Sequence, residues 1–479
     1  MIHRLLIFVL PFIILLFEIF FQILSDYPGG QTNMVIFMTS WMVSWWIFGI
    51  APLGITGLIP LVFLPLMNIL SIKELTPYYS DSMIFLFLGG FILARGLEKT
   101  ELSERFALKV LTVTGRSDGG IVVGFIIATA SLSMWISNTA TAIMMIPIAQ
   151  SVIHFLKINT EHSEKDIRNI STVIYLSIAY AANIGGTVTP IGTPPNVLFI
   201  GYLENLYHIK IDFWKWVVVM APVAFVLLGL QYFFLNWLFK YKIAITGEFR
   251  HFVQKKVKEL DPFNSAQKLA LGIFFLSCFL WIFKDPLNHL VASNLLNDTS
   301  IAILGGCLLF FVPYNLKGFK RILDHDDIAT LPWNIILLFG GGMAMAGSME
   351  KFGIIQSMVS MFDHLPASSP YLITFMIATL VLVLTEVMSN VALCMVALPM
   401  IMTLAQAKGI DPVLVGLPAA ISASYAFSLP ISTPPNAIVF GTNKITMKDM
   451  LKAGIVMNIM GLFSLMTLGW FMIKIFFDS

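Results

Sequence analysis

The chain has 479 residues, of which 57% are hydrophobic and 12% are charged, and its mean hydropathy is +0.85. A soluble protein usually carries about a quarter charged residues, so this chain cannot cover a folded surface with polar groups, which excludes a soluble enzyme and a disordered scaffold. Its 29 Lys and Arg residues nearly balance 27 Asp and Glu residues, which argues against a nucleic-acid partner. The composition predicts an all-α polytopic membrane protein that lies in a lipid bilayer.

The first apolar run predicts an N-terminal transmembrane helix within residues 1–32. The basic start of the run also fits a signal peptide, but the run is too long and lacks a small-residue cleavage site. Residues 33–240 and 268–479 then predict two repeats, joined by a basic cytoplasmic connector at 241–267. In all we expect about 11 transmembrane helices.

Four further apolar regions are interrupted by glycine, proline and polar residues. The regions 121–158 and 370–407 are predicted to be re-entrant hairpins, each of which enters and leaves on one side of the membrane. The regions 170–208 and 413–442 are predicted to be helices that break near their middle.

The distribution of charge favours these hairpins. If both hairpins are re-entrant, 22 of the 29 Lys and Arg residues fall on the side that carries the N-terminus. Basic loops remain in the cytoplasm, so we expect a cytoplasmic N-terminus and a location in the cell inner membrane. A full crossing by 121–158 would instead turn the basic connector outward.

The two repeats share a motif in the same order. Each hairpin has a Ser-Asn pair at its middle, and a Thr-Pro-Pro-Asn sequence interrupts the helix that follows. The copies are Ser137-Asn138 with Thr193-Pro194-Pro195-Asn196, and Ser389-Asn390 with Thr433-Pro434-Pro435-Asn436. An odd number of crossings separates them, so their topologies are opposite. Inverted repeats with discontinuous helices are typical of secondary transporters.

The Thr-Pro-Pro-Asn sequences predict the position of each helix break. Two consecutive prolines end one half-helix, and proline is favoured at the start of the next. Carbonyls that the break leaves free cannot face lipid, so this backbone must line a cavity or bind an ion. A simple proline kink is the alternative, although two copies in register argue against it.

The Ser-Asn pairs predict helix N-termini at the hairpin turns. Ser, Thr and Asn are preferred N-caps, and the free N–H groups and partial positive charge of a helix N-terminus attract anions. Two turns that arrive from opposite membrane faces would hold the two ends of a dianion. In the alternative reading, these residues only cap and pack the hairpins.

The sequence offers the anion no basic side chain, because no Lys or Arg lies near either turn. Hydroxyl, carboxamide and carbonyl oxygens are concentrated there instead, and such hard ligands suit Na+, which would couple cation and anion in symport. Proton coupling usually needs intramembrane acids or histidines. Glu386 is the acid in an apolar stretch, and it either titrates or is a structural carboxylate bonded to hairpin backbone. Without a Ser/His pair, a metal-spaced His cluster or paired acids at membrane depth, no enzyme is expected.

Three segments resemble a known family. The run from Ser424 to Val439, SYAFSLPISTPPNAIV, is similar to the signature of the divalent anion/sodium symporters, and MWISNT from Met134 and TEVMSN from Thr385 resemble the family's two hairpin-turn motifs. This family includes the sodium-dependent dicarboxylate, citrate and sulfate carriers of solute carrier family 13. The resemblance covers essentially the whole chain.

The resemblance implies a homodimer in which a mobile transport domain carries the substrate by an elevator motion. It implies two Na+ sites: Ser133, Ser137, Asn138 and the backbone around Gly192 for the first, and Thr385, Ser389, Asn390 and the backbone around Ser432 for the second. The substrate carboxylates would meet Asn138, Thr139, Thr193 and Pro194 on one side, and Ser389, Asn390, Val391, Thr433 and Pro434 on the other. Val391 stands where many bacterial members have Thr, so one hydroxyl is missing there.

The function expected from these patterns is Na+-coupled uptake of a C4-dicarboxylate such as succinate, malate or fumarate. The alternatives within the same fold are a Na+-independent dicarboxylate exchanger, a citrate carrier and a sulfate carrier.

Overall fold

The computed structural model describes residues 7–15, 30–115, 117–158, 163–243, 247–291, 295–360 and 369–477. These residues are helical or lie in loops, apart from the short antiparallel strands β1 (Pro313–Asn315) and β2 (Lys320–Arg321). Residues 7–15 form a helix that precedes α2. The helices of the first half are α2 (Gly30–Phe48), α3 (Leu53–Thr56), α4 (Ile59–Leu66), α5 (Ile72–Tyr79), α6 (Ser82–Lys99), α7 (Leu102–Thr114), α8 (Asp118–Ser133), α9 (Asn138–Ile158), α10 (Glu164–Gly186), α11 (Pro194–Tyr207) and α12 (Phe213–Leu238).

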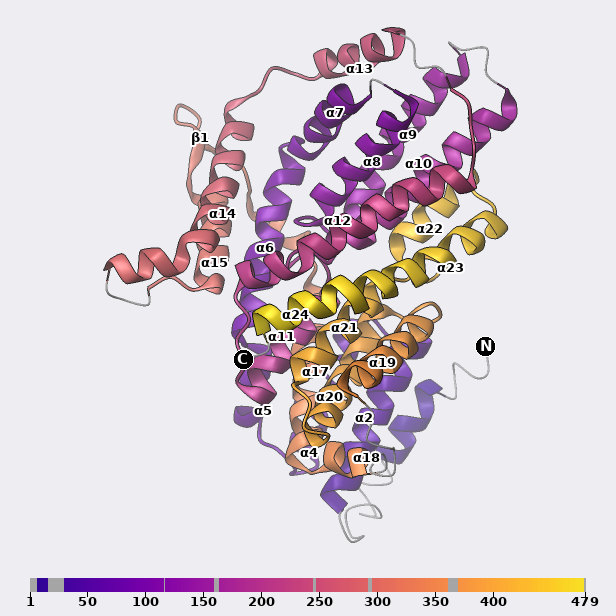
Figure 1. Ribbon diagram of the computed structural model, residues 1–479. Helices are drawn as coiled ribbons and strands as arrows, with labels where there is room; N and C mark the ends of the chain where they lie inside the picture. Colours follow the sequence, from indigo (N-terminus) through magenta and orange to yellow (C-terminus); the bar gives the residue numbers. More distant parts are fainter. Residues whose placement is uncertain are drawn as a thin grey trace.

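The second half follows with a further series of helices (Figure 1). They are α13 (Gly247–Glu259), α14 (Ser265–Val291), α15 (Asp298–Phe311), α16 (His325–Ala329), α17 (Trp333–Lys351), α18 (Ile354–Ser360), α19 (Pro370–Thr385), α20 (Asn390–Ala407), α21 (Pro412–Ser424), α22 (Pro434–Gly441), α23 (Met447–Ser464), the π-helical segment η1 (Leu465–Gly469) and α24 (Trp470–Phe477).

Six helical stretches in the described part of the chain are long and apolar enough to cross a membrane on their own. Five shorter apolar helices accompany them, among them α8, α19 and α21. A shorter helix cannot cross about 30 Å of hydrocarbon alone. Length alone therefore gives fewer spans than the expected 11, because the hairpin arms α8 and α19 and the half-helix α21 are too short to be counted, whereas the other hairpin arms, α9 and α20, are long enough.

The hairpins and broken helices of the two halves are built alike. The antiparallel arms α8 and α9 form hairpin 1, and α19 and α20 form hairpin 2. The broken helices are α10 with α11 and α21 with α22. In each broken helix a Thr is the N-cap of the second half-helix and prolines occupy its first positions, as expected for a helix that restarts at Pro.

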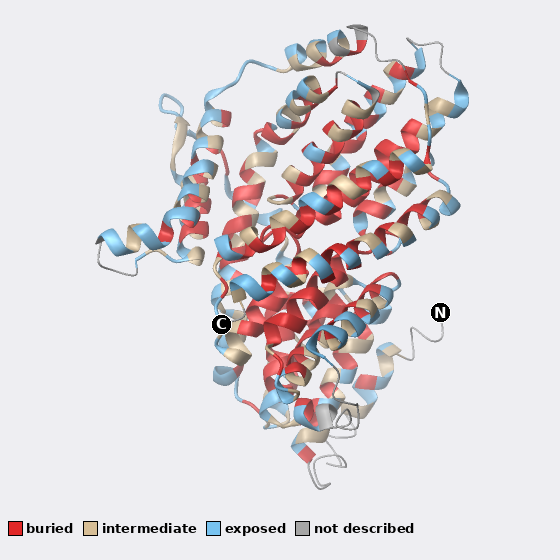
Figure 2. Ribbon diagram, viewed as in Figure 1, coloured by how far each residue is buried: buried red, intermediate tan, exposed pale blue. Residues whose placement is uncertain are grey.

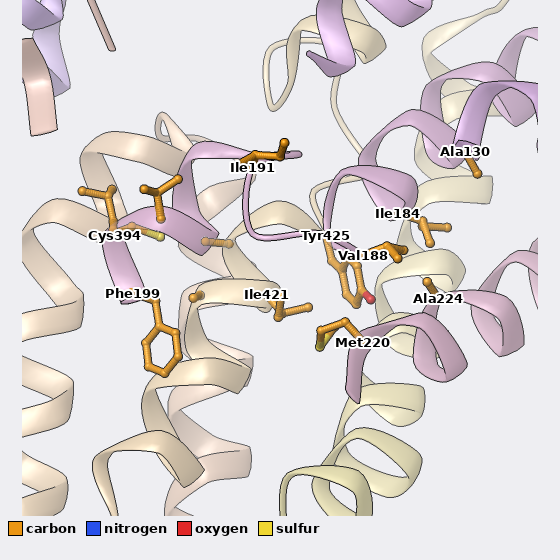
Figure 3. Packing of buried hydrophobic residues seen from close by; sticks show 14 of the residues in the cluster. Ala130, Ile184, Val188, Ile191, Phe199, Met220, Ala224, Cys394, Ile421 and Tyr425 are labelled. Atoms are coloured by element: carbon orange, nitrogen blue, oxygen red, sulfur yellow. The ribbon is translucent and has the colours of Figure 1, made fainter. Parts of the chain in front are cut away.

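The broken helices interlock the two halves of the chain. The half-helix α11 packs against α20 and α21 of the second half, and α22 packs against α9 and α10 of the first. Residues 170–186 of α10 and all of α21 are buried, and they lie at the centre of the molecule (Figure 2). Figure 3 shows buried side chains from both halves in this region, among them Val188 and Tyr425. The core is therefore shared between the halves.

Basic segments from three parts of the chain meet at one end of the molecule. Arg168 at the start of α10 pairs with Asp449 at the start of α23 over 3.6 Å, and Asn169 donates to the carbonyl of Lys240, which follows α12, over 2.7 Å. The connector helix α13 lies at this end as well (Figure 1).

The tryptophans of α2 pack against other parts of the chain. In membrane proteins Trp and Tyr often lie at the water interface, and Trp41, Trp45 and Trp46 fit such a belt. In the structure all three are buried. Trp45 stacks on Phe8 at 5.7 Å, and its indole N–H donates to the carbonyl of Ile7. Trp41 and Trp45 are four residues apart, so they share the helix face that packs on residues 7–15.

Candidate functional site

The turn of hairpin 1, residues 134–137, brings side-chain and backbone oxygens together. The buried hydroxyl of Ser133 lies 2.6 Å from Oδ1 of Asn138 and 2.8 Å from the carbonyl oxygen of Ala182 in α10. Asn138 is the first residue of α9, and Oδ1 of its side chain lies beside Gly186, at the end of α10. The turn is thus fitted against the point where the first broken helix ends.

The turn of hairpin 2, residues 386–389, repeats this geometry. The buried hydroxyl of Thr385 lies 2.7 Å from Oδ1 of Asn390 and 2.7 Å from the carbonyl oxygen of Ala423 in α21. Each turn therefore gathers one hydroxyl, one carboxamide and one helix carbonyl, and each places an Asn at the start of the second arm. Such oxygens are hard ligands.

Asparagine side chains bridge both helix breaks. Nδ2 of Asn196 donates to the carbonyls of Gly186 and Thr189, and Nδ2 of Asn436 donates to those of Ala426 and Leu429. Four of the backbone carbonyls at the breaks thus accept hydrogen bonds from these side chains, and they need neither a water-filled cavity nor an ion. The Oδ1 atoms of Asn196 and Asn436 are buried without a hydrogen-bond partner in the described part of the chain.

The segment before α11 folds tightly over the end of α10. A Cβ placed on Gly192 would lie 2.4 Å from the carbonyl oxygen of Gly186, and a Cβ on Gly186 would lie 2.4 Å from Oδ1 of Asn138. Both contacts are shorter than any side chain tolerates. Gly186 and Gly192 therefore allow the turn of hairpin 1 and the helix break to approach each other.

Glu386 ties the second turn to the second helix break. Its carboxylate accepts hydrogen bonds from the backbone N–H groups of Phe427, Ser428 and Leu429. The hydroxyl of Ser432 and Nδ2 of Asn458 in α23 also donate to it, over 2.5 and 2.6 Å. Hydrogen bonds from this many donors offset the cost of burying a charged carboxylate. Of the two readings of Glu386, this geometry favours the structural carboxylate bonded to backbone.

The expected ligands differ in how far they are exposed. Ser133, Thr385, Ser432, Thr193, Thr433 and Gly192 are buried, whereas Asn138, Thr139, Pro194, Asn390 and Val391 are partly exposed and Ser137, Ser389 and Pro434 are exposed. The structure therefore gathers the oxygens of Ser133 and Thr385 behind the turns, and leaves the turn residues themselves accessible. The hydroxyl of Ser432 is directed at Glu386, so only its backbone remains for a second cation site.

The two halves meet at the broken helices. Nδ2 of Asn183 in α10 donates to the hydroxyl of Thr433, the N-cap of α22, over 3.1 Å. Beside this contact the rings of Tyr180 and Phe427 pack edge to face, with centroids 5.1 Å apart. Contacts thus run from the first turn through α10 and Thr433 to Glu386 in the second turn.

Sequence reasoning did not assign roles to Asn183 and Asn458. Both are polar residues in apolar helices. This pattern could have indicated a role for them, because a buried polar side chain needs a hydrogen-bond partner.

The two turns have no basic residue close to them along the chain. The segments 117–156, 169–209, 352–407 and 409–443 contain no Lys or Arg. Within the described residues no group of three His, Cys, Asp or Glu side chains is placed to hold a metal ion. A cation at the turns would therefore be bound by hydroxyl, carboxamide and carbonyl oxygens.

The multi-span helical fold, with two polar hairpin turns meeting two interlocked broken helices, defines a membrane transporter. The chain belongs to the family described as the sodium:sulfate symporter transmembrane region, whose model matches residues 4–477. The expected family, the all-helical class and the absence of an enzyme function are thereby confirmed.

Two relatives with the same description are similar to this chain over most of its length. The chain is 35% identical over 469 residues to the sodium-dependent dicarboxylate transporter SdcS of Staphylococcus saprophyticus, covering 97% of this chain and 90% of the relative. It is 36% identical over 456 residues to SdcS of Staphylococcus aureus strain NCTC 8325, covering 94% and 87%.

Two solved structures share the fold at low sequence identity. The YdaH transporter of Alcanivorax borkumensis matches with a TM-score of 0.58 and 11% identity over 93% of this chain and 98% of that one. MtrF of Neisseria gonorrhoeae, described as illuminating a class of antimetabolite efflux pumps, matches with a TM-score of 0.53 and 10% identity over 91% of this chain and 97% of that one. At this identity the likeness concerns the fold alone.

Proposed function

We propose that the protein is a secondary transporter that carries a C4-dicarboxylate, such as succinate, malate or fumarate, into the cytoplasm together with Na+. The observation that carries this proposal is the duplicated turn, in which a hydroxyl, an Asn carboxamide and a helix carbonyl converge twice. The names of the two staphylococcal relatives support the substrate class.

In this proposal each turn binds one Na+ on its inner side. Ser133, Ser137, Asn138 and the backbone around Gly192 form the first site. Thr385, Ser389, Asn390 and the backbone around Ser432 form the second. The hydroxyl and carboxamide oxygens of each pair already lie within 2.7 Å of one another, so ligation would replace the hydrogen bond that now holds them.

The dicarboxylate would lie between the outer sides of the turns. One carboxylate meets Asn138, Thr139, Thr193 and Pro194, and the other meets Ser389, Asn390, Val391, Thr433 and Pro434. Partial charges at helix N-termini are too small to balance a dianion, so the Na+ ions supply the missing positive charge. Anion and cation would therefore bind together, which is the physical basis of symport.

The transport movement is proposed to be of the elevator type within a homodimer in the cell inner membrane, with a cytoplasmic N-terminus. The interlocked broken helices support a common moving body, because α11 and α22 each pack on the other half. The basic segments that meet at one end of the molecule support the orientation.

The test is succinate uptake into proteoliposomes with an inward Na+ gradient or an equal K+ gradient. We expect uptake only with Na+, and a loss of about tenfold or more in Asn138→Ala and in Asn390→Ala, because each change removes a ligand shared by cation and anion. Asn315→Ala, at the exposed end of strand β1, is the matched control and should retain uptake.

Full uptake without Na+ would overturn the proposal. Counterflow of succinate without Na+ would identify an exchanger. Na+-dependent uptake of sulfate or citrate, but not succinate, would keep the coupling and replace the substrate.

A further inference from the structure

A cavity of about 740 Å³ lies beside hairpin 1, away from the bridged helix breaks. It is enclosed by α7, the end of α8, the turn of hairpin 1, α14 and the connector. The lining residues that bear on its ligand are Ser103, Arg105, Lys109, Ser131, Leu132, Trp135 and Phe274. Sites for small organic ligands usually measure about 300–1,000 Å³, so the cavity is large enough for such a ligand.

The lining is apolar, with positive charge contributed by α7. Arg105 and Lys109 are four residues apart and therefore share one face of that helix. In the described chain neither forms an ion pair, and no carboxylate lines the cavity. Arg105 is held in place, since its guanidinium donates to the carbonyl of Asp261 and lies 5.7 Å from the centroid of Phe263. The cavity thus offers two basic side chains without a direct ion pair, one of them held at a fixed position.

Two buried polar atoms of lining residues lack a partner. The side chain of Ser103 is 3% exposed, and neither its hydroxyl nor Nε of Arg105 forms a hydrogen bond in the described part of the chain. A buried polar group without a partner is costly. An oxygen-rich anionic group in the cavity would satisfy both donors.

The apolar part of the lining extends toward the outer face of α14. Phe275, which lines the cavity, is 60% exposed, and Phe279 one turn further on is 48% exposed. A helix face of this kind is covered by lipid chains in a bilayer. An occupant with a hydrocarbon chain can therefore reach the cavity sideways from the membrane.

We propose that this cavity binds one anionic phospholipid. The phosphate lies against Arg105 and Lys109 and accepts from Ser103, and an acyl chain lies against Leu132, Trp135 and Phe274. Arg and Lys recognise phosphate, and basic pockets between transmembrane helices bind anionic headgroups. A soluble anion would leave the apolar wall without a partner, and an uncharged lipid would leave the two cations without one.

The position of this lipid connects two parts of the transporter. Trp135 and Ile136 belong to the turn of hairpin 1, just before Asn138, whereas Phe274 and Phe275 belong to α14. A bound lipid therefore contacts both the hairpin that holds a candidate Na+ site and the helix beside which that hairpin lies.

The test is native mass spectrometry of the full chain in detergent supplemented with equal amounts of phosphatidylglycerol and phosphatidylcholine. We expect the wild type to retain phosphatidylglycerol about fivefold or more over phosphatidylcholine. The double variant Arg105→Gln/Lys109→Gln should lose this preference. Ser131→Trp, which places an indole in the cavity and keeps both cations, should reduce retention of either lipid.

The matched control is Lys157→Gln/Lys165→Gln, which removes two exposed positive charges outside the cavity and should keep the preference. Size-exclusion chromatography and melting temperature show whether each variant is folded. An equal retention of both lipids by the wild type, or an unchanged preference in Arg105→Gln/Lys109→Gln, overturns the proposal. Displacement of phosphatidylglycerol by an excess of glycerol phosphate also overturns it, because the site would then recognise the anion alone.

Discussion

Glu386 distinguishes the second hairpin turn from the first, where Met134 occupies the equivalent position after the hydroxyl residue Ser133. Its carboxylate accepts from three backbone N–H groups, from Ser432 and from Asn458. The backbone of Ser432, a candidate ligand of the second cation, is held by these contacts. In the proposed transporter, Glu386 would thus position the candidate second site without being one of its expected ligands.

We expect Glu386→Gln to lower both the melting temperature and Na+-dependent uptake. The amide replaces an acceptor oxygen with an N–H₂ group that faces donors, which costs about 1–3 kcal/mol. Scanning fluorimetry and proteoliposome uptake measure the two effects, and the exposed Glu259→Gln is the control. A variant of unchanged stability in which uptake loses a dependence on pH would instead show that Glu386 is a titrating group.

The serines of the two turns have different local roles. The hydroxyl of Ser137 accepts from the N–H of Ala140 over 3.2 Å, whereas Ser389, the N-cap of α20, forms no capping bond through its side chain. The hydroxyl of Ser389 is therefore available to a ligand at no cost to its helix.

We expect Ser137→Ala to destabilise the protein by about 1 kcal/mol, the usual cost of losing an N-cap. Ser389→Ala should leave the melting temperature unchanged and raise the Na+ concentration needed for half-maximal uptake. Melting curves and the Na+ dependence of uptake separate the two. An equal loss of stability in both variants would contradict the distinction.

At the scale of the structural elements, the first helix break is compact because two of its residues are glycines without a side chain. Gly186 and Gly192 let the end of α10, the segment before α11 and Asn138 approach within van der Waals distance. Asn196 then fastens the break from inside. The break is thus a fixed structure rather than a flexible hinge.

We expect Gly186→Ala to abolish uptake, because its methyl group would lie 2.4 Å from Oδ1 of Asn138 and displace that side chain. Gly229→Ala in α12 is the matched control: no atom lies within 4 Å of the added methyl group, and Ala favours a helix over Gly. Uptake and melting temperature are measured for both. Normal uptake by Gly186→Ala would show that Asn138 is not needed where the structure places it.

The sequence predicts the elements better than their contacts. The Ser-Asn pairs and the prolines mark the turns and breaks because they act locally, on the backbone of the same helix. Asn183 and Asn458 find their partners 250 and 72 residues away, and a single sequence does not pair positions so distant. The burial of Trp45 depends likewise on Ile7 and Phe8, which lie far from it in the chain.

At the scale of the whole molecule, two groups of helices meet at hairpin 1. Trp135 of its turn packs edge to face on Phe274 of α14 at 4.8 Å, and it lies parallel to Trp281 of the same helix at 6.3 Å. The starts of α10 and α23 are instead joined to each other by Arg168 and Asp449. An elevator movement would break the contacts between hairpin 1 and α14 and keep the contact between α10 and α23.

We expect a cross-link between hairpin 1 and α14 to stop transport. In a background without Cys278, Cys307 and Cys394, which are free thiols, the pair Trp135→Cys/Phe274→Cys would be bridged by Hg²⁺. Uptake measured before and after bridging should fall by about tenfold or more, since the movement, rather than binding, is blocked. Reversal by excess thiol shows that the bridge is responsible.

The control is Arg168→Cys/Asp449→Cys, which joins α10 to α23 near the basic connector. Both helices pack on α12, so we assign them to one moving body, and bridging them should leave uptake unchanged. If both bridges stop uptake, transport requires rearrangement within that body. If neither does, hairpin 1 and α14 move together, and the moving boundary must lie elsewhere, for example between α17 and α20, which also pack against each other.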